Sequence, residues 1–193
     1  MRILITDGEG PITRNDNAFE LSSFFIPNGE NFFAVISSYD DVLAYLIRKP
    51  GYKAGDTLKL ILPFLKAYGA TDNGIEDYSR KNLLLIPKAK EALDYLKPIM
   101  PIYMVSTSYE PYVKVVCETL NLPMKNVYCT KLNIDKYELN EEAEKLKGFS
   151  MEISRMKPIK IPRNASSLND LSRKDRETID RLNKIFWEEL PSM

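Results

Sequence analysis

The chain has 193 residues, enough for one sizeable hydrophobic core with smaller additions. Its 27 basic and 27 acidic side chains balance, so no net field draws it toward nucleic acid or an anionic membrane. It contains no histidine, which excludes Ser-His-Asp triads, Cys-His dyads and histidine-rich zinc sites. Any catalysis must therefore use carboxylates, hydroxyls or lysines.

No apolar stretch approaches the ~20 residues that span a bilayer, and the first apolar run meets Asp7 too soon for a signal peptide. We therefore expect a cytoplasmic protein that is not embedded in a membrane. Cys117 and Cys129 both stand in apolar runs, which is typical of reduced structural thiols and not of a disulfide framework.

The first predicted element is a short strand at residues 3–6, which is apolar and rich in β-branched side chains. It stops at a cluster of turn-forming residues, Asp7-Gly8-Glu9-Gly10-Pro11. Residues 15–79 then follow a helical pattern. Ser38 and Asp41 resemble a capping box within it, and Asp56 is placed to cap a later helix. We interpret this segment as a helical cap insertion.

Strands and helices alternate over the next part of the chain. Residues 102–105 predict a second buried strand that closes on Ser106-Thr107-Ser108, residues 112–120 a helix, and residues 126–134 a third strand. Such alternation favours an α/β fold with a parallel, Rossmann-like sheet. The predicted core therefore comprises residues 1–14 and 80–138.

The remaining residues, 139–193, are predicted to add a hairpin and helices that could form a second cap. Residues 140–147 have the pattern of a short charged helix, and residues 149–161 alternate like a strand or hairpin. Ser172 and Asp175 are spaced to cap a last helix.

Two candidate site positions follow predicted strands. In open parallel sheets, ligands bind beyond the carboxyl ends of the strands, where Asp7 and Ser106 would lie. A carboxylate held directly after a buried strand suits a nucleophile that forms an aspartyl-phosphate, and Glu9 could transfer protons nearby. Ser106, with Thr107 beside it, could bind phosphate oxygens. The plainer alternative is an acidic turn after the first strand and a serine that caps a helix.

These residues resemble the haloacid dehalogenase (HAD) superfamily of phosphatases and phosphotransferases. Its first motif is an apolar strand followed by D-x-D-G, matched here by Asp7-Gly8-Glu9-Gly10 with glutamate for the second aspartate; its second motif is a strand ending in Ser or Thr, matched at Ser106. The resemblance implies that Asp7 is a nucleophile and Mg²⁺ ligand. It implies that Glu9 is a general acid/base whose carbonyl touches the metal, and that Ser106 binds the phosphate of a small phosphorylated metabolite.

One family motif has no match in this sequence. The family places paired aspartates or a G-D-x-x-x-D pattern after a later strand, and Asp135 comes too early for that role. Two explanations stay open: the core is truncated at its C-terminus, or a HAD-like protein has lost its metal chemistry. The closer resemblance is to archaeal proteins labelled energy-converting hydrogenase A, subunit R. It implies an alternative function as a non-catalytic accessory subunit of a membrane-associated hydrogenase complex.

Overall fold

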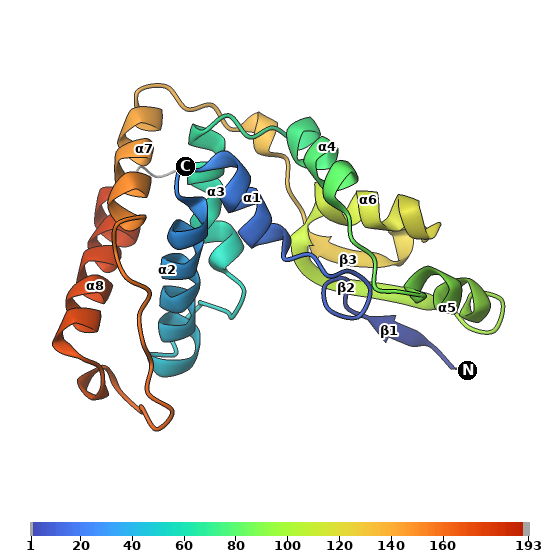
Figure 1. Cartoon of the computed structure of the whole chain (residues 1–193), viewed down its shortest axis with the longest axis horizontal. Helices are drawn as coiled ribbons and strands as arrows, with labels where there is room; N and C mark the ends of the chain where they lie inside the picture. Colours follow the sequence, from blue (N-terminus) through green and yellow to red (C-terminus); the bar gives the residue numbers. More distant parts are fainter. Residues whose placement is uncertain (1, 191–193) are drawn as a thin grey trace. The chain divides into compact units, whose positions relative to one another are not determined.

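A computed structural model describes residues 2–190 of the chain (Figure 1). The chain divides into two compact units. The first, Met1–Glu20 with Thr71–Lys136, contains all the strands of the described residues and is called the sheet unit here. The second, Leu21–Ala70 with Tyr137–Met193, is called the helical unit. Each is described by itself.

The sheet unit is built on three parallel strands in the order β1-β2-β3. These are β1 (Leu4–Thr6), β2 (Ile102–Tyr109) and β3 (Val127–Thr130). Leu4 pairs with Ile102, and Met104 pairs with Val127. The predicted parallel α/β arrangement is confirmed.

Strand β2 is longer than predicted and continues through Ser106 and Ser108 to Tyr109. Its pairing with β3 shifts register between Val105 and Tyr109, an irregularity of the kind that bends a strand. The serines therefore lie within the strand and not in a loop after it. The third strand is shorter than expected: it ends at Thr130, and a 3-10 turn (Ile134–Lys136) follows three residues later.

Three helices of the sheet unit are α4 (Asp72–Asn82), α5 (Ala89–Leu96) and α6 (Glu110–Leu120). In Figure 1, α4 and α6 lie above the strands. The buried side chains of this unit form one apolar cluster: Ile12, Leu93, Ile102, Met104, Tyr112, Val113, Val116, Cys117, Leu120, Leu122 and Val127. Since β2 alternates between buried and exposed residues, this cluster packs on one face of the sheet.

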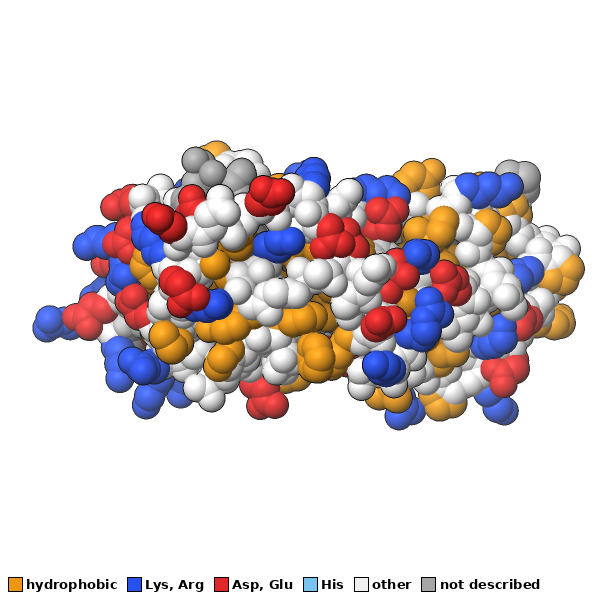
Figure 2. All heavy atoms as spheres, turned by 90° about the horizontal axis from the view of Figure 1, so that it is seen from above, with side chains coloured by type: hydrophobic (Ala, Val, Ile, Leu, Met, Phe, Trp, Pro, Cys, Tyr) orange, Lys and Arg blue, Asp and Glu red, His pale blue; other side chains and the backbone are white. Residues whose placement is uncertain are grey.

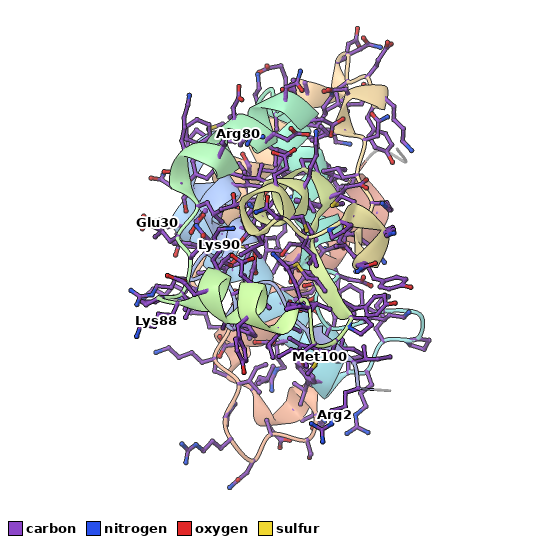
Figure 3. All side chains as sticks on the ribbon, turned by 90° about the vertical axis from the view of Figure 1, so that its right-hand side faces the viewer. Arg2, Glu30, Arg80, Lys88, Lys90 and Met100 are labelled. Atoms are coloured by element: carbon purple, nitrogen blue, oxygen red, sulfur yellow. The ribbon has the colours of Figure 1, made fainter. Side chains whose placement is uncertain are left out.

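The two ends of the sheet differ in chemistry. The Leu4 N–H donates to the Pro101 carbonyl at 3.0 Å where β1 and β2 begin. Arg2 and Met100 lie near one another at this amino-terminal end (Figure 3). Asp7 and Ser106 belong to the opposite end, toward which the parallel strands run.

The helical unit contains α2 (Gly29–Asp41), α3 (Thr57–Ala67), α7 (Glu142–Ile153) and α8 (Arg173–Lys184), with π-helical turns at Val42–Leu46 and Ile185–Glu189. Helix α1 (Asn17–Phe25) begins in the sheet unit and continues into it. The rings of Phe32 and Phe64 meet edge to face at 5.0 Å, and Tyr39 stacks on Phe186. Aromatic packing therefore joins segments far apart in the sequence.

The structure divides the chain differently from the predicted boundaries. Two separate additions were expected at residues 15–79 and 139–193, whereas residues 21–70 and 137–193 form a single unit, in which α7 packs against both α2 and α3. Helix α4, expected within the insertion, belongs to the sheet unit, where it packs on α6. Sequence patterns could not reveal which helical faces would meet.

Two local predictions are wrong. Residues 149–153 belong to helix α7 and not to a hairpin, because Leu146, Ser150 and Ile153 recur at helical spacing and are buried together. The expected capping box at Ser38 is also absent, since α2 runs through this position and the Ser38 hydroxyl donates to the Val35 carbonyl. The cap predicted at Ser172 is confirmed: its hydroxyl accepts from the Asp175 N–H at 3.1 Å.

Three expectations from composition concern membrane-spanning helices, surface charge and the two cysteines. Within residues 2–190, no helix is both long and apolar enough to cross a membrane. Figure 2 shows acidic and basic side chains interspersed on the face it presents. Both cysteines are free, and burial raises the pKa of the Cys117 thiol to about 11, as expected of a structural thiol.

Candidate functional site

The loop after β1 is folded back on itself by backbone hydrogen bonds. The Gly10 N–H donates to the Thr13 carbonyl at 2.9 Å, and the Thr13 N–H donates to the Gly8 carbonyl at 2.9 Å. Gly10 has a φ of 91°, in the left-handed region that glycine adopts without steric cost. The buried Thr13 hydroxyl lies 2.8 Å from the Tyr112 hydroxyl of α6. The loop is thus fixed to the core of the sheet unit, which holds Asp7 and Glu9 in place.

The first strand's end lies against the second strand at Ser106. Thr6 pairs with Met104, and a Cβ atom at Gly8 would lie 3.6 Å from Ser106 Oγ. The Asp7 carboxylate is exposed and accepts the Gly8 N–H at 2.6 Å. It forms no ion pair with any basic side chain in the described range. An exposed carboxylate of this kind is accessible to a substrate.

Glu9 is held much more tightly than Asp7. Its Oε1 accepts the Asn17 N–H at the start of α1, at 3.0 Å, and the Ser108 hydroxyl at 2.9 Å. The Ser106 hydroxyl in turn donates to Ser108 Oγ at 3.1 Å. A continuous chain of hydrogen bonds therefore runs from Ser106 through Ser108 to Glu9.

The environment of Glu9 favours its protonated form. Burial raises the pKa of the Glu9 carboxyl above its ordinary value, and the hydrogen bonds from Asn17 and Ser108 offset only part of this effect. The neighbouring carboxylates of Asp16 and Asp7 raise the pKa further. A carboxyl group with a raised pKa can donate a proton closer to neutral pH.

The structure brings together three of the four predicted site residues. Asp7, Glu9 and Ser106 lie at one end of the sheet, whereas Thr107 is exposed on the opposite face of β2. The Thr107 carbonyl accepts the Thr130 hydroxyl of β3. Strand geometry separates it from Ser106, because successive side chains point to opposite faces.

Two residues in this cluster were not predicted. Ser108 shares the buried face of β2 with Ser106; a two-residue period extended past Val105 would have indicated it. Asn17 opens α1, and Asp16 before it accepts the Phe19 N–H at 3.0 Å as a helix cap does. The Asn17 side chain is buried, and its amide N and O have no hydrogen-bond partner among the described residues.

The described residues do not supply a complete Mg²⁺ site. The resemblance assigns the Asp7 carboxylate and the Glu9 backbone carbonyl as ligands, while the Glu9 carboxylate is engaged through Oε1 with Asn17 and Ser108. No group of three or more His, Cys, Asp or Glu side chains within residues 2–190 could hold a metal ion. Because Mg²⁺ requires near-octahedral oxygen coordination, one carboxylate and one carbonyl need further ligands.

A solved structure is similar to this chain over most of its length. It is described as the structure of gene product AF1437 from Archaeoglobus fulgidus, with 27% sequence identity and a TM-score of 0.75. The match covers 93% of this chain but 57% of that one, so this chain spans a little over half the length of its structural neighbour. No family model and no curated protein matches the sequence.

Proposed function

We propose that the chain carries the nucleophile-bearing part of a HAD-type hydrolase of phosphate esters. The observation that carries this proposal is the grouping of Asp7, Glu9 and Ser106 at the carboxyl-terminal end of a parallel sheet, where α/β proteins bind ligands. The D-x-E-G form of the first motif and the serine on the second strand support the family assignment.

In the proposed reaction, an Asp7 carboxylate oxygen attacks the phosphorus atom of the substrate. The bond from phosphorus to the ester oxygen breaks, and Glu9 donates a proton to the departing oxygen. Water then attacks the phosphorus of the aspartyl-phosphate while Glu9 recovers a proton from it. Phosphate leaves and Asp7 is restored.

The hydroxyl chain from Ser106 to Glu9 supports this division of roles. Ser106 is 8% exposed, and its hydroxyl could turn from Ser108 toward a phosphoryl oxygen. Ser108 would keep the Glu9 carboxyl oriented in the meantime. Residues 15–79, the insertion between the two motifs, would correspond to the cap that selects a small phosphorylated metabolite in the family that the chain resembles. Mg²⁺, which would neutralise phosphoryl charge, requires ligands beyond Asp7 and Glu9.

The second candidate is a non-catalytic accessory subunit of an energy-converting hydrogenase complex. The incomplete set of metal ligands favours it, as do the two hydrogen bonds that fix the Glu9 carboxylate within the fold. In that case Asp7 would be an exposed turn residue without a chemical role.

The test measures phosphate release from a panel of small phosphate monoesters. It uses the chain together with any residues that its natural reading frame adds after Met193, with and without Mg²⁺. We expect Asp7→Asn to lose at least about 1,000-fold of the metal-dependent rate, because an amide is a poor nucleophile at phosphorus. The control, Asp77→Asn, changes an exposed aspartate on α4 and should retain the rate.

Equal rates of phosphate release for Asp7→Asn and the unchanged chain would contradict the proposed hydrolase activity. Stable co-purification with hydrogenase subunits, without turnover of any ester, would instead support the accessory function.

A further inference from the structure

A small pocket lies on the helical unit, between the end of α2 and the chain that follows α7. Its volume is about 320 Å³, near the lower end of the roughly 300–1,000 Å³ of small-molecule binding sites. One wall carries Asp41, Tyr45 and Leu46, and the other carries Ile161, Pro162 and Arg163. We call these six residues the Asp41 pocket. All six belong to the helical unit, and none belongs to the group around Asp7.

The second wall is fixed against two helices by backbone hydrogen bonds. The Ile159 N–H donates to the Ser38 hydroxyl of α2 at 2.9 Å, and the Lys160 N–H donates to the Asp175 carboxylate of α8 at 3.3 Å. In Figure 1, this part of the chain runs between α2 and α8. Bonds to both helices therefore hold in place the segment that carries Arg163.

The first wall contains a π-helical turn. The Ile47 N–H donates to the Val42 carbonyl, five residues earlier, at 2.8 Å. Such turns are rare and frequently lie at functional sites. Tyr45 and Leu46, which line the pocket, both belong to this turn. The irregular backbone is thus located where the pocket is.

Two opposite charges in the pocket have no partner in the fold. The side chains of Asp41 and Arg163 form no hydrogen bond or ion pair with each other or with any other residue in the range 2–190. Partial burial raises the pKa of the Asp41 carboxyl, and the neighbouring Asp40 carboxylate raises it further. A positive group from a ligand would offset both effects.

We propose that the Asp41 pocket binds a free α-amino acid with an apolar side chain. The Asp41 carboxylate accepts hydrogen bonds from the ammonium group of the ligand. The Arg163 guanidinium donates to the ligand carboxylate, which its planar fork of N–H groups fits. The apolar side chain packs against Leu46, Ile161 and Pro162. This inference does not depend on phosphate-ester hydrolysis.

The charge pattern favours a zwitterion over a simple ion. An anion such as phosphate would be attracted by Arg163 and repelled by Asp41, and a simple amine would meet the reverse. A zwitterion satisfies both charges at once. The apolar part of the lining favours a ligand with a side chain to bury, which glycine lacks.

Isothermal titration calorimetry of the unchanged chain with leucine tests the proposal. We expect saturable binding at one site per chain. Two analogues of leucine should bind at least about 10-fold more weakly: 4-methylpentanoic acid, which lacks the ammonium group, and 3-methylbutylamine, which lacks the carboxylate. Glycine should bind at least about 10-fold more weakly as well. Absence of saturable leucine binding would overturn the proposal, and so would an analogue that binds as tightly as leucine.

Variants of the two charged residues test which groups hold the ligand. Asp41→Asn and Arg163→Gln should each weaken leucine binding at least about 10-fold, because each removes one charge from the pocket. The matched controls, Asp180→Asn and Arg155→Gln, change exposed residues outside the pocket and should leave the affinity unchanged. Unchanged affinity in either pocket variant, or an equal loss in the controls, would contradict the assignment. The analogue series uses the unchanged chain, so it decides the proposal even if a variant fails to fold.

Discussion

Glu9 is held by hydrogen bonds in an environment that disfavours its charged form. Its carboxyl group accepts hydrogen bonds from the first turn of α1 and from Ser108 of β2, so it links two elements of the sheet unit. Burial nevertheless makes its charged form costly and raises its pKa. A fixed carboxyl group with a raised pKa is what the proposed general acid requires.

This raised pKa predicts a pH dependence of stability. At pH values between its ordinary value of 4.5 and its raised value, native Glu9 retains a proton that the unfolded chain releases. Its contribution is therefore complete below 4.5 and is lost as pH rises through the raised value. Glu9→Gln keeps an acceptor oxygen but has no proton to lose. We expect its free energy of unfolding to improve relative to the unchanged chain as pH rises.

Urea denaturation at several values between about pH 4 and pH 7 would measure this difference. A constant difference across the range would contradict the burial effect assigned to Glu9.

At the scale of elements, the start of α3 depends on a residue distant from it in sequence. The buried Asp40 of α2 accepts the Thr57 N–H at 3.1 Å, the Gly55 N–H at 3.3 Å and the Tyr52 hydroxyl at 2.5 Å. Asp56, which the sequence pattern indicated as the cap, makes no capping hydrogen bond to this helix. One carboxylate thus fixes the whole loop between α2 and α3.

This arrangement predicts that replacing Asp40 lowers the free energy of unfolding much more than replacing Asp56. Asp40→Ala should lower the free energy of unfolding by about 2–4 kcal/mol, because it leaves three donors without their acceptor. Asp56→Ala removes a bond to the Lys53 N–H and an ion pair with the exposed Lys59, and should cost about 1 kcal/mol or less. Chemical denaturation would measure the free energy of unfolding of both variants. Equal losses would indicate that Asp56 caps the helix after all.

At the scale of the whole molecule, each unit has its own buried core. The sheet unit packs around Met104 and α6, and the helical unit packs around Phe32, Phe64 and Tyr39. Trp187, the single tryptophan, belongs to the helical unit, where its indole N–H donates to the Tyr39 hydroxyl at 2.9 Å. Its fluorescence therefore reports on one unit.

Two core truncations should affect this fluorescence differently. Phe64→Ala should cost about 3–5 kcal/mol and shift the Trp187 transition to lower denaturant. Val116→Ala removes packing from the sheet unit and should leave the Trp187 transition in place while lowering the transition seen by circular dichroism. If both variants shift the fluorescence equally, the chain unfolds as one cooperative body.

The sequence by itself determined the elements whose signals are local. Apolar β-branched runs predicted three strands, and alternation with helices predicted that these strands are parallel. The same topology predicted that Asp7 and Ser106 would come to one end of the sheet, and the backbone of Gly8 does lie against Ser106. Ser172 was identifiable as a cap because its partner is three residues away.

Only the tertiary structure decided the features that depend on distant parts of the chain. The union of residues 21–70 with 137–193, the cap from Asp40 and the hydrogen bonds on Glu9 all join segments that no sequence period connects. The exposure of Ile5, Val105 and Tyr128 on one side of the sheet was also decided by the tertiary structure. A strand's pattern predicts two faces, but whether a face is covered depends on which helices pack there.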